Sequence, residues 1–265
     1  MDTEDQVREW RKQQRSRLLA LRAEMAPAAH AACSERITQL LEQGFALLAK
    51  FTVGFCWPYL REYDARFAVR YFRSCGAVAA LPLVVSKRAP LQFRQWWPGA
   101  PMLRGVYDIP IPDDTPLAEP DAVIVPMNGF DQAGFRLGYG GGFFDRTLAS
   151  LTPQPIAIGV AFEAMRLGTI YPRPHDVPMD FVVTEAGLRE VANGALKALT
   201  IEQCVQAVRQ LAHARGLPRP ASVHAGGAGA SAQYSSPVCY APEFPGYYET
   251  QTEADPPAAT DPKSG

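Results

Sequence analysis

Short apolar runs alternate along this chain with longer segments of helical pattern. Runs rich in β-branched and aromatic residues, typical of buried strands, lie at residues 51–56, 77–85, 91–97, 122–126, 156–162 and 181–184. Segments typical of helices lie between and around them, at residues 5–22, 28–48, 64–75, 143–151 and 194–216. Strands that alternate with helices predict an α/β fold, here a single domain with a mainly parallel sheet flanked by helices.

The composition changes near the C-terminal end of the chain. Of the 265 residues, 47% are hydrophobic, which is enough to bury a core. Gly, Ala, Ser and Gln dominate residues 225–235, and residues 251–265 are polar and rich in Pro. We therefore predict an α/β domain over residues 1–216 and a low-complexity, disordered tail over residues 217–265. An alternative for part of the tail is a docking peptide, Ser236–Tyr240 with Tyr247-Tyr248.

Charge and cysteine content argue against several classes of protein. The formal net charge of −1 lacks the basic excess of a whole-domain nucleic-acid binder. The five cysteines are scattered and include no CxxC pair, which disfavours a disulfide framework or zinc site and favours a reducing compartment. The apolar runs are too short to span a bilayer, and residues 1–17 lack the apolar centre of a signal peptide. We expect a cytoplasmic monomer with no membrane or nucleic-acid partner.

The most specific pattern follows the apolar run at 122–126. It reads Arg136-Leu137-Gly138-Tyr139-Gly140-Gly141-Gly142-Phe143-Phe144-Asp145-Arg146, with four glycines within five residues. Glycine lets backbone N–H groups approach a ligand closely as an anion nest, and the start of the following helix adds its positive dipole end. With the two arginines this pattern favours a polyphosphate, although turns also use glycine for other reasons. It is neither a Walker A loop nor a GxGxxG fingerprint.

Two carboxylates near this segment are candidates for a magnesium site. Asp145 lies in the first turn of the expected helix, and Asp176 lies in the stiff, proline-containing stretch His175–Asp180. Mg²⁺ is typically held by one or two carboxylates together with phosphate oxygens. The alternatives are an acid favoured by the helix dipole for Asp145 and ordinary turn chemistry for Asp176, and residue types alone leave both open.

Three stretches together resemble the signature motifs of the 5-formyltetrahydrofolate cyclo-ligase family, also called methenyltetrahydrofolate synthetases. They are the arginine-rich segment that ends at Ala20-Leu21, the string Asp131–Arg146 and the string His175–Glu185. They occur in the family's order and spacing, and the resemblance covers roughly residues 7–187. It implies an enzyme that uses ATP and Mg²⁺ to convert 5-formyltetrahydrofolate into 5,10-methenyltetrahydrofolate, with release of ADP and phosphate.

The resemblance also implies which residues form the site. Its ATP contacts fall on Arg11, Arg136, Leu137, Gly138, Tyr139, Gly140, Gly141, Gly142, Phe143 and Phe144. Its folate contacts fall on Trp57, Glu62, Tyr139 and Phe143, and its magnesium ligands fall on Asp145 and Asp176. Arg136 and Phe143 are the implied catalytic members. From residue type alone, Trp57 would be a packing aromatic and Glu62 a solvated acid.

The implied reaction needs little covalent chemistry from the protein. A formyl oxygen leaves poorly until its attack on the γ-phosphate converts it into a phosphate ester. N10 of the folate then closes on the activated carbon, and phosphate departs. The protein must align the formyl oxygen with the γ-phosphorus and neutralise charge, and arginines, a backbone nest and Mg²⁺ suit that task.

The sequence departs from the family pattern at two places. A basic residue is common where Val7 falls, and Tyr-Tyr is usual where Phe143-Phe144 falls. We expect slower turnover rather than loss of function, because ring packing survives without the hydroxyl. One alternative is a non-catalytic homologue that binds nucleotide or folate, and another is an RNA-associated protein that uses the basic side chains of the first helix, Arg8, Arg11, Lys12, Arg15 and Arg17.

Overall fold

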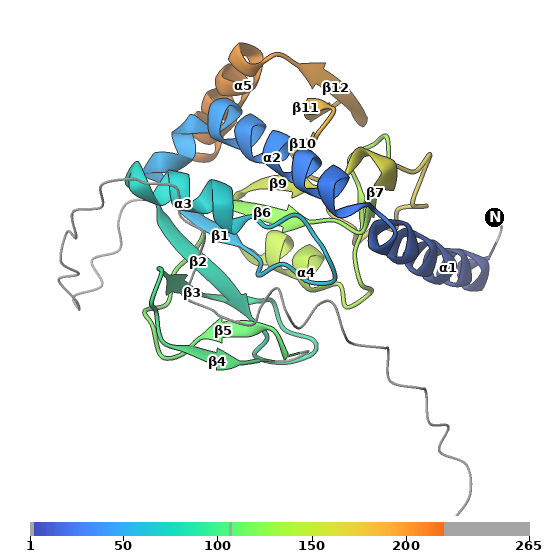
Figure 1. Cartoon of the computed structure of the whole chain (residues 1–265), viewed down its shortest axis with the longest axis horizontal. Coiled ribbons are helices and arrows are strands. Elements are labelled where there is room, and N and C mark those ends of the chain that lie inside the picture. Colours follow the sequence, from blue (N-terminus) through green and yellow to red (C-terminus); the bar gives the residue numbers. More distant parts are fainter. Residues whose placement is uncertain (1–2, 106–107, 220–265) are drawn as a thin grey trace, which may run out of the picture. The chain divides into compact units, whose positions relative to one another are not determined.

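A computed structural model describes residues 3–105 and 108–219, and one eight-stranded sheet dominates it (Figure 1). The strand order is β12-β11-β10-β9-β6-β1-β2-β3. The bounds are β1 (Thr52–Phe55), β2 (Val78–Leu83), β3 (Gln92–Trp96), β6 (Ala122–Pro126), β9 (Ile156–Val160), β10 (Phe181–Thr184), β11 (Gly187–Ala192) and β12 (Ala195–Leu199). The five central strands, β10, β9, β6, β1 and β2, pair with one another in parallel. The pairs β2–β3, β10–β11 and β11–β12 are antiparallel. The predicted α/β fold with a mainly parallel sheet is confirmed.

Helices cover both faces of the sheet, which explains why its central strands are apolar throughout. Every residue of β9 and β10 is buried. Helices α2 (Pro27–Gly44), α3 (Arg66–Ser74) and α5 (Ile201–Arg215) lie on one side, and α4 (Phe143–Ser150) lies on the other (Figure 1). In the part of the chain that is described, no helix is both long and apolar enough to cross a membrane.

Local capping fixes the ends of the first and last helices. Thr3 caps α1 (Glu4–Ala23) and Thr200 caps α5, each in a capping box with a glutamine three residues later. Helix α5 ends at Gly216, whose φ of 66° suits glycine. The expected second helix, 28–48, ends earlier, at Gly44, and a 3₁₀ turn, η1 (Ala46–Lys50), follows it.

The predicted helix over 194–216 is wrong in its first part. Residues Ala195–Leu199 form β12, which pairs with β11 as a hairpin, and only Ile201–Arg215 is helical. The turn is Asn193-Gly194, with φ of 53° and 72°, and this pair is the strongest short-range signal of a hairpin. A further pair of short strands lies outside the apolar runs named above: β5 (Pro110–Pro112) pairs with β4 (Met102–Arg104) in antiparallel fashion.

The described chain continues past the predicted domain boundary at residue 216. Leu217 is buried, and the Arg219 backbone N–H donates to Asp121 Oδ1 at 2.9 Å. The folded part therefore includes residues 217–219. The rest of the predicted tail, with the alternative docking peptide at 236–240, lies outside the described residues.

The sheet topology locates the place where a ligand can bind. From β1 the chain proceeds to β2 on one side, whereas β6, β9 and β10 follow on the other side. The strand order therefore reverses between β1 and β6, and ligands of open α/β sheets bind beyond the carboxyl ends of the strands at such a point. A two-stranded ribbon, β7 (Gly129–Phe130) with β8 (Arg136–Leu137), leads from β6 into the glycine segment.

Candidate functional site

A cavity of about 800 Å³ lies beyond the carboxyl ends of β1 and β6. Every site residue predicted from the sequence lines it: Arg11, Trp57, Glu62, Arg136, Leu137, Gly138, Tyr139, Gly140, Gly141, Gly142, Phe143, Phe144, Asp145 and Asp176. Its wall also includes residues that the prediction did not name, chiefly Arg15, Arg173, Tyr59, Leu81, Val84, Leu91, Ile109 and Ile111. Val7 is not part of the wall. The fold thus brings together segments that are far apart in the chain.

The loop of residues 138–142 has the geometry of an open anion nest. Gly140 and Gly142 have φ of 97° and 62°, a region that side chains other than glycine rarely adopt. Gly142 is the N-cap of α4, and no side chain caps this end of the helix. Within the described chain, none of the five backbone N–H groups of the loop donates a hydrogen bond. Free amides beside a helix N-terminus are the donors that a phosphate group requires.

Two arginines hold the carbonyl side of this loop. Arg15 on α1 donates from Nε to the carbonyl of Gly138 at 2.8 Å, and Arg146 donates to the carbonyl of Gly141 at 2.8 Å. Burial lowers the pKa of Arg15, and the positive charges of Arg11 and Arg173 lower it further. Such a concentration of positive charge beside open amides favours an anionic ligand.

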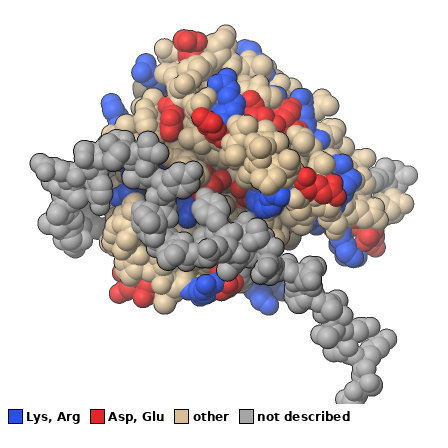
Figure 2. All heavy atoms as spheres, in the orientation of Figure 1, with Lys and Arg blue, Asp and Glu red and all other residues tan. Residues whose placement is uncertain are grey.

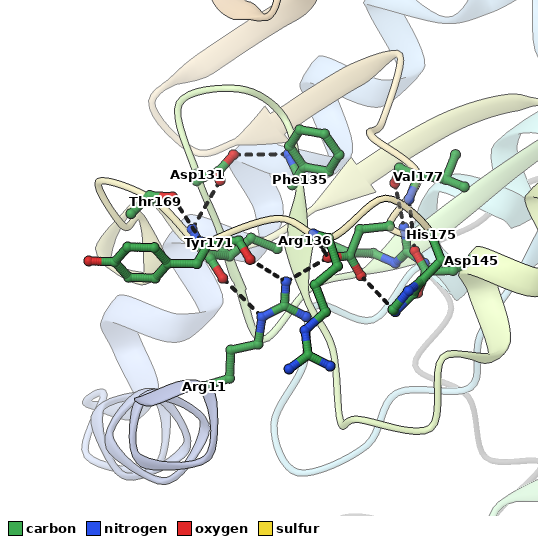
Figure 3. Close-up of polar contacts among 12 residues, drawn as sticks. Arg11, Asp131, Phe135, Arg136, Asp145, Thr169, Tyr171, His175 and Val177 are labelled. Carbon is green, nitrogen blue, oxygen red and sulfur yellow. Dashed lines mark hydrogen bonds and ion pairs between the residues drawn. The ribbon is translucent and has the colours of Figure 1, made fainter. Parts of the chain in front are cut away.

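A buried ion pair joins the start of the glycine segment to α4. Arg136 and Asp145 are 2.9 Å apart, with side chains 5% and 18% exposed. Both also bond the backbone of Val177, because Arg136 donates to its carbonyl at 2.9 Å and Asp145 Oδ1 accepts its N–H at 3.0 Å (Figure 3). Burial lowers the pKa of Arg136, an effect that the charge of Asp145 opposes.

A second ion pair connects α1 to the segment that follows β9. Arg11 reaches from α1 to this segment, donating to the carbonyls of Ile170 and Tyr171 and to Asp176 Oδ2 at 2.5 Å (Figure 3). Asp176 Oδ2 also accepts the backbone N–H of Arg173 at 2.7 Å. Burial acts to raise the pKa of Asp176, but these hydrogen bonds and the charge of Arg11 outweigh it, so the pKa is lowered. Asp176 stays ionised.

The two predicted magnesium ligands, Asp145 and Asp176, could supply part of the coordination shell of Mg²⁺. Asp145 and Asp176 line one cavity, and the two are joined to arginines that suit phosphate oxygens. Among the described residues, no group of three or more His, Cys, Asp or Glu side chains could form a complete cage. Mg²⁺ typically takes one or two carboxylates and completes its shell with substrate phosphates and water, so the donor set matches that chemistry.

A different arrangement surrounds Glu62 on another wall of the cavity. Glu62 is only 6% exposed, so it is not the solvated acid that its residue type favours. Its Oε1 accepts the Tyr139 hydroxyl at 2.8 Å, and its Oε2 accepts the Tyr59 backbone N–H at 3.1 Å. Burial raises the pKa of Glu62, opposed by Arg22 and these hydrogen bonds. Trp57 is also buried, with the Arg66 guanidinium 4.3 Å from its ring centre.

Sequence reasoning did not assign two arginines of α1, Arg15 and Arg22, to the site, and Arg15 was named only in the RNA alternative. Arg22 is 2% exposed and donates to the Leu60 carbonyl at 2.8 Å and to the Tyr139 hydroxyl at 2.9 Å. Arg11, Leu18 and Arg22 are the buried residues of α1. Their spacing of seven and four residues places them on one face of the helix. A basic residue on the face that carries the apolar Leu18 was the sequence signal that could have identified Arg22.

The positions of the Arg11 and Arg15 side chains argue against the alternative that α1 binds RNA. Arg11 is buried in its ion pair and Arg15 is half-buried against the glycine loop, so neither side chain lies on an open basic face. On the face drawn in Figure 2, the described basic and acidic side chains are interspersed. The charges of Arg11 and Arg15 are thus directed toward the cavity.

The fold and this cavity define an α/β protein with a glycine loop, suited to an anion, at the carboxyl edge of its sheet. The chain belongs to the 5-formyltetrahydrofolate cyclo-ligase family, whose model matches residues 7–185. The resemblance drawn from the three motifs is thereby confirmed.

Curated 5-formyltetrahydrofolate cyclo-ligases are among the chain's relatives. The protein of Mycolicibacterium smegmatis is 35% identical over 118 residues, which are 41% of this chain and 60% of the relative. The protein of Escherichia coli is 37% identical over 81 residues, which are 29% of this chain and 43% of the relative. In these alignments the chain therefore spans less than two thirds of the relatives' length.

Solved structures of 5,10-methenyltetrahydrofolate synthetases share the fold. The Aquifex aeolicus structure has a TM-score of 0.60 and 22% identity, and the match covers 72% of this chain and 96% of that one. The Mycoplasma pneumoniae structure has a TM-score of 0.55 and 22% identity, with coverage of 66% and 98%. At this identity the likeness concerns the fold.

Proposed function

We propose that this chain catalyses the ATP- and Mg²⁺-dependent cyclisation of 5-formyltetrahydrofolate to 5,10-methenyltetrahydrofolate. The observation that carries the proposal is the open glycine loop, which lines the same cavity as Glu62 and the two arginine–aspartate pairs. Family membership supports it, because the matched region, 7–185, contains all of these residues. The cavity volume of about 800 Å³ suits two ligands of moderate size.

In this proposal the glycine loop, Arg11, Arg15 and Arg136 bind the triphosphate. The amides of residues 138–142 and the N-terminus of α4 receive phosphate oxygens, and the arginines neutralise the charge that develops on the γ-phosphoryl group. Asp145 and Asp176 would hold Mg²⁺, which supplies further charge neutralisation when it is bound. Phe143, whose ring lies 5.0 Å from the Arg146 guanidinium, would form part of the wall between the two ligands.

The folate would lie against Glu62 and Trp57. The Glu62 carboxylate accepts hydrogen bonds and is suited to the N–H groups of a pterin edge, and Trp57 offers a rigid apolar surface beside it. The formyl oxygen attacks the γ-phosphorus, and ADP leaves. N10 then attacks the activated formyl carbon, and phosphate and the N10 proton depart. The chain's contribution is alignment of these atoms and exclusion of water.

The direct test is an absorbance assay with the full chain. We expect purified protein, 5-formyltetrahydrofolate, MgCl₂ and ATP to give methenyltetrahydrofolate absorbance and equimolar ADP, and we expect EDTA to abolish both. A substitution of Asp145 by Asn should raise the Mg²⁺ concentration required for half-maximal rate, whereas Asp108→Asn, at an exposed carboxylate, should not. Absence of product with every divalent metal would overturn the proposal.

The non-catalytic homologue is the main competitor, and Phe143 provides its test. Tight binding of both ligands without ADP release, unchanged in Phe143→Tyr, would favour that alternative. A monomeric state remains part of the proposal, and so does a cytoplasmic location, which the free thiols of Cys33, Cys56, Cys75 and Cys204 support.

A further inference from the structure

The backbone just before Glu62 adopts a conformation that its residues do not favour. Leu60 and Arg61 have φ of 46° and 59°, so two successive residues other than glycine lie in the left-handed region. Each such residue typically costs about 1 kcal/mol or more and persists only where the surrounding structure holds it. This strained turn ends at Glu62, whose carboxylate lines the cavity.

The junction between α1 and α2 holds the strained turn from one side. Arg22 donates from Nε to the carbonyl of Leu60 at 2.8 Å, and His30 Nε2 contacts the carbonyl of Arg61 at 2.9 Å. Arg61 in turn donates to the carbonyls of Ala23 and Met25, the latter at 2.7 Å. The carbonyls of Leu60 and Arg61 therefore both have partners from this junction. These contacts hold the turn, and with it Glu62, in one orientation.

Arg22 also reaches Glu62 through a second route. It donates to the Tyr139 hydroxyl at 2.9 Å, and that hydroxyl donates to Glu62 Oε1 at 2.8 Å. Arg22 is one of the largest fully buried side chains, and no carboxylate among the described residues lies within ion-pair distance of it. A buried charge without a direct counter-ion destabilises the fold through lost hydration, and an apolar side chain at the same position of α1 would avoid that loss. The arrangement thus indicates a role beyond packing.

We propose that Arg22 is a positioning residue for the pterin-binding carboxylate of Glu62, an inference that rests on the proposed function. Arg22 holds the Leu60 carbonyl and the Tyr139 hydroxyl, so that Glu62 is fixed at the cavity wall. When pterin N–H groups replace Tyr139 at Oε1, the Tyr139 hydroxyl still accepts from Arg22. The exchange therefore leaves no buried hydroxyl without a hydrogen bond, and its cost stays low.

The test measures the dissociation constant for 5-formyltetrahydrofolate by calorimetry, together with the KM for each substrate. We expect Arg22→Met to weaken folate binding about 10- to 100-fold, because two charged hydrogen bonds are lost. Arg22→Lys keeps the charge and one bond, so it should lie between wild type and Arg22→Met. The KM for ATP should stay within a factor of two. Arg17→Met, on the exposed side of the same helix, is the matched control and should match wild type.

A double-mutant cycle separates positioning from general stability. If Arg22 acts through Glu62, adding Arg22→Met to Glu62→Gln should weaken folate binding by less than a factor of two beyond Glu62→Gln alone. Additive losses, parallel rises in both KM values, or a lower melting temperature with unchanged folate affinity would each overturn the inference. Wild-type protein that binds the folate without forming product would count against the proposed function only. Wild-type protein that does not bind it would overturn both.

Discussion

The two halves of the cavity handle buried carboxylates in opposite ways. On the side that we propose binds phosphate, here called the phosphate side, Asp176 and Asp145 each contact an arginine directly, at 2.5 Å and 2.9 Å. On the side that we propose binds the folate, here called the folate side, Glu62 is linked to Arg22 through the Tyr139 hydroxyl. The pKa of Asp176 is accordingly lowered, whereas burial raises the pKa of Glu62. In the proposed function, direct pairing keeps a carboxylate charged beside phosphate, and indirect pairing lets Glu62 exchange the Tyr139 hydroxyl for a ligand.

Neighbouring residues of one loop serve both halves. The Gly138 carbonyl is held by Arg15 on the phosphate side, and the Tyr139 side chain lies against Glu62 on the folate side. The following changes test how far the two halves differ.

Loss of Arg136 should have the largest effect. In the proposed function Arg136 neutralises charge on the γ-phosphoryl group, so we expect Arg136→Ala to lower kcat about 100- to 1,000-fold. It also leaves Asp145 without its ion-pair partner, which should destabilise the fold by roughly 3–5 kcal/mol. Steady-state kinetics and thermal unfolding measure the two effects. Arg166→Ala, at a partly exposed arginine away from the cavity, is the control, and equal losses in both variants would contradict the assignment.

Glu62→Gln should affect the folate half alone. The amide can accept only one of the two pterin hydrogen bonds, so we expect the KM for 5-formyltetrahydrofolate to rise about 10- to 100-fold. The KM for ATP should stay within a factor of two, because the phosphate wall is unchanged. Glu35→Gln, at an exposed site on α2, controls for the substitution itself. An equal rise in both KM values would mean that the halves are not separate.

Mild acid should separate the halves without any mutation. Because the pKa of Glu62 is raised, this residue takes up a proton at a higher pH than an ordinary glutamate. Because the pKa of Asp176 is lowered, that residue is still ionised there. As pH falls, the KM for the folate should therefore rise before the KM for ATP. The early rise should disappear in Glu62→Gln, and its persistence in that variant would point to another group.

Asn128 belongs to neither half and should give the smallest effect on activity. Its side chain is 1% exposed, and neither of its polar atoms has a hydrogen-bond partner in the described chain. Asn128→Leu should stabilise the fold by about 1–3 kcal/mol, because an unsatisfied buried amide is removed. Thermal unfolding would show this as a higher melting temperature with both KM values unchanged. A lower melting temperature would show that the amide is satisfied in solution.

Local sequence signals predict most of the fold and the glycine loop, whereas Arg11, Trp57 and Glu62 were predicted only from the family resemblance. Alternation of apolar runs with helical segments indicates the parallel sheet, because each run is long enough for only one buried strand. The glycine segment and the motif around Asp176 locate the phosphate side, since both depend on residues that are close together in the chain. The hairpin at Asn193-Gly194 escapes this reasoning although its signal is local, because the turn pair adjoins a strong helical pattern.

The sequence by itself determined six of the eight strands of the main sheet, the position of the glycine-rich loop and the family that the chain resembles, because those properties depend on neighbours in the chain. Only the tertiary structure decided which charges meet. Arg11 contacts Asp176 across 165 residues of sequence, and Arg22 contacts Tyr139 across 117. Burial and partner contacts then shifted the pKa values of Glu62 and Asp176 in opposite directions, since desolvation and partner distance depend on how the helices pack on the sheet.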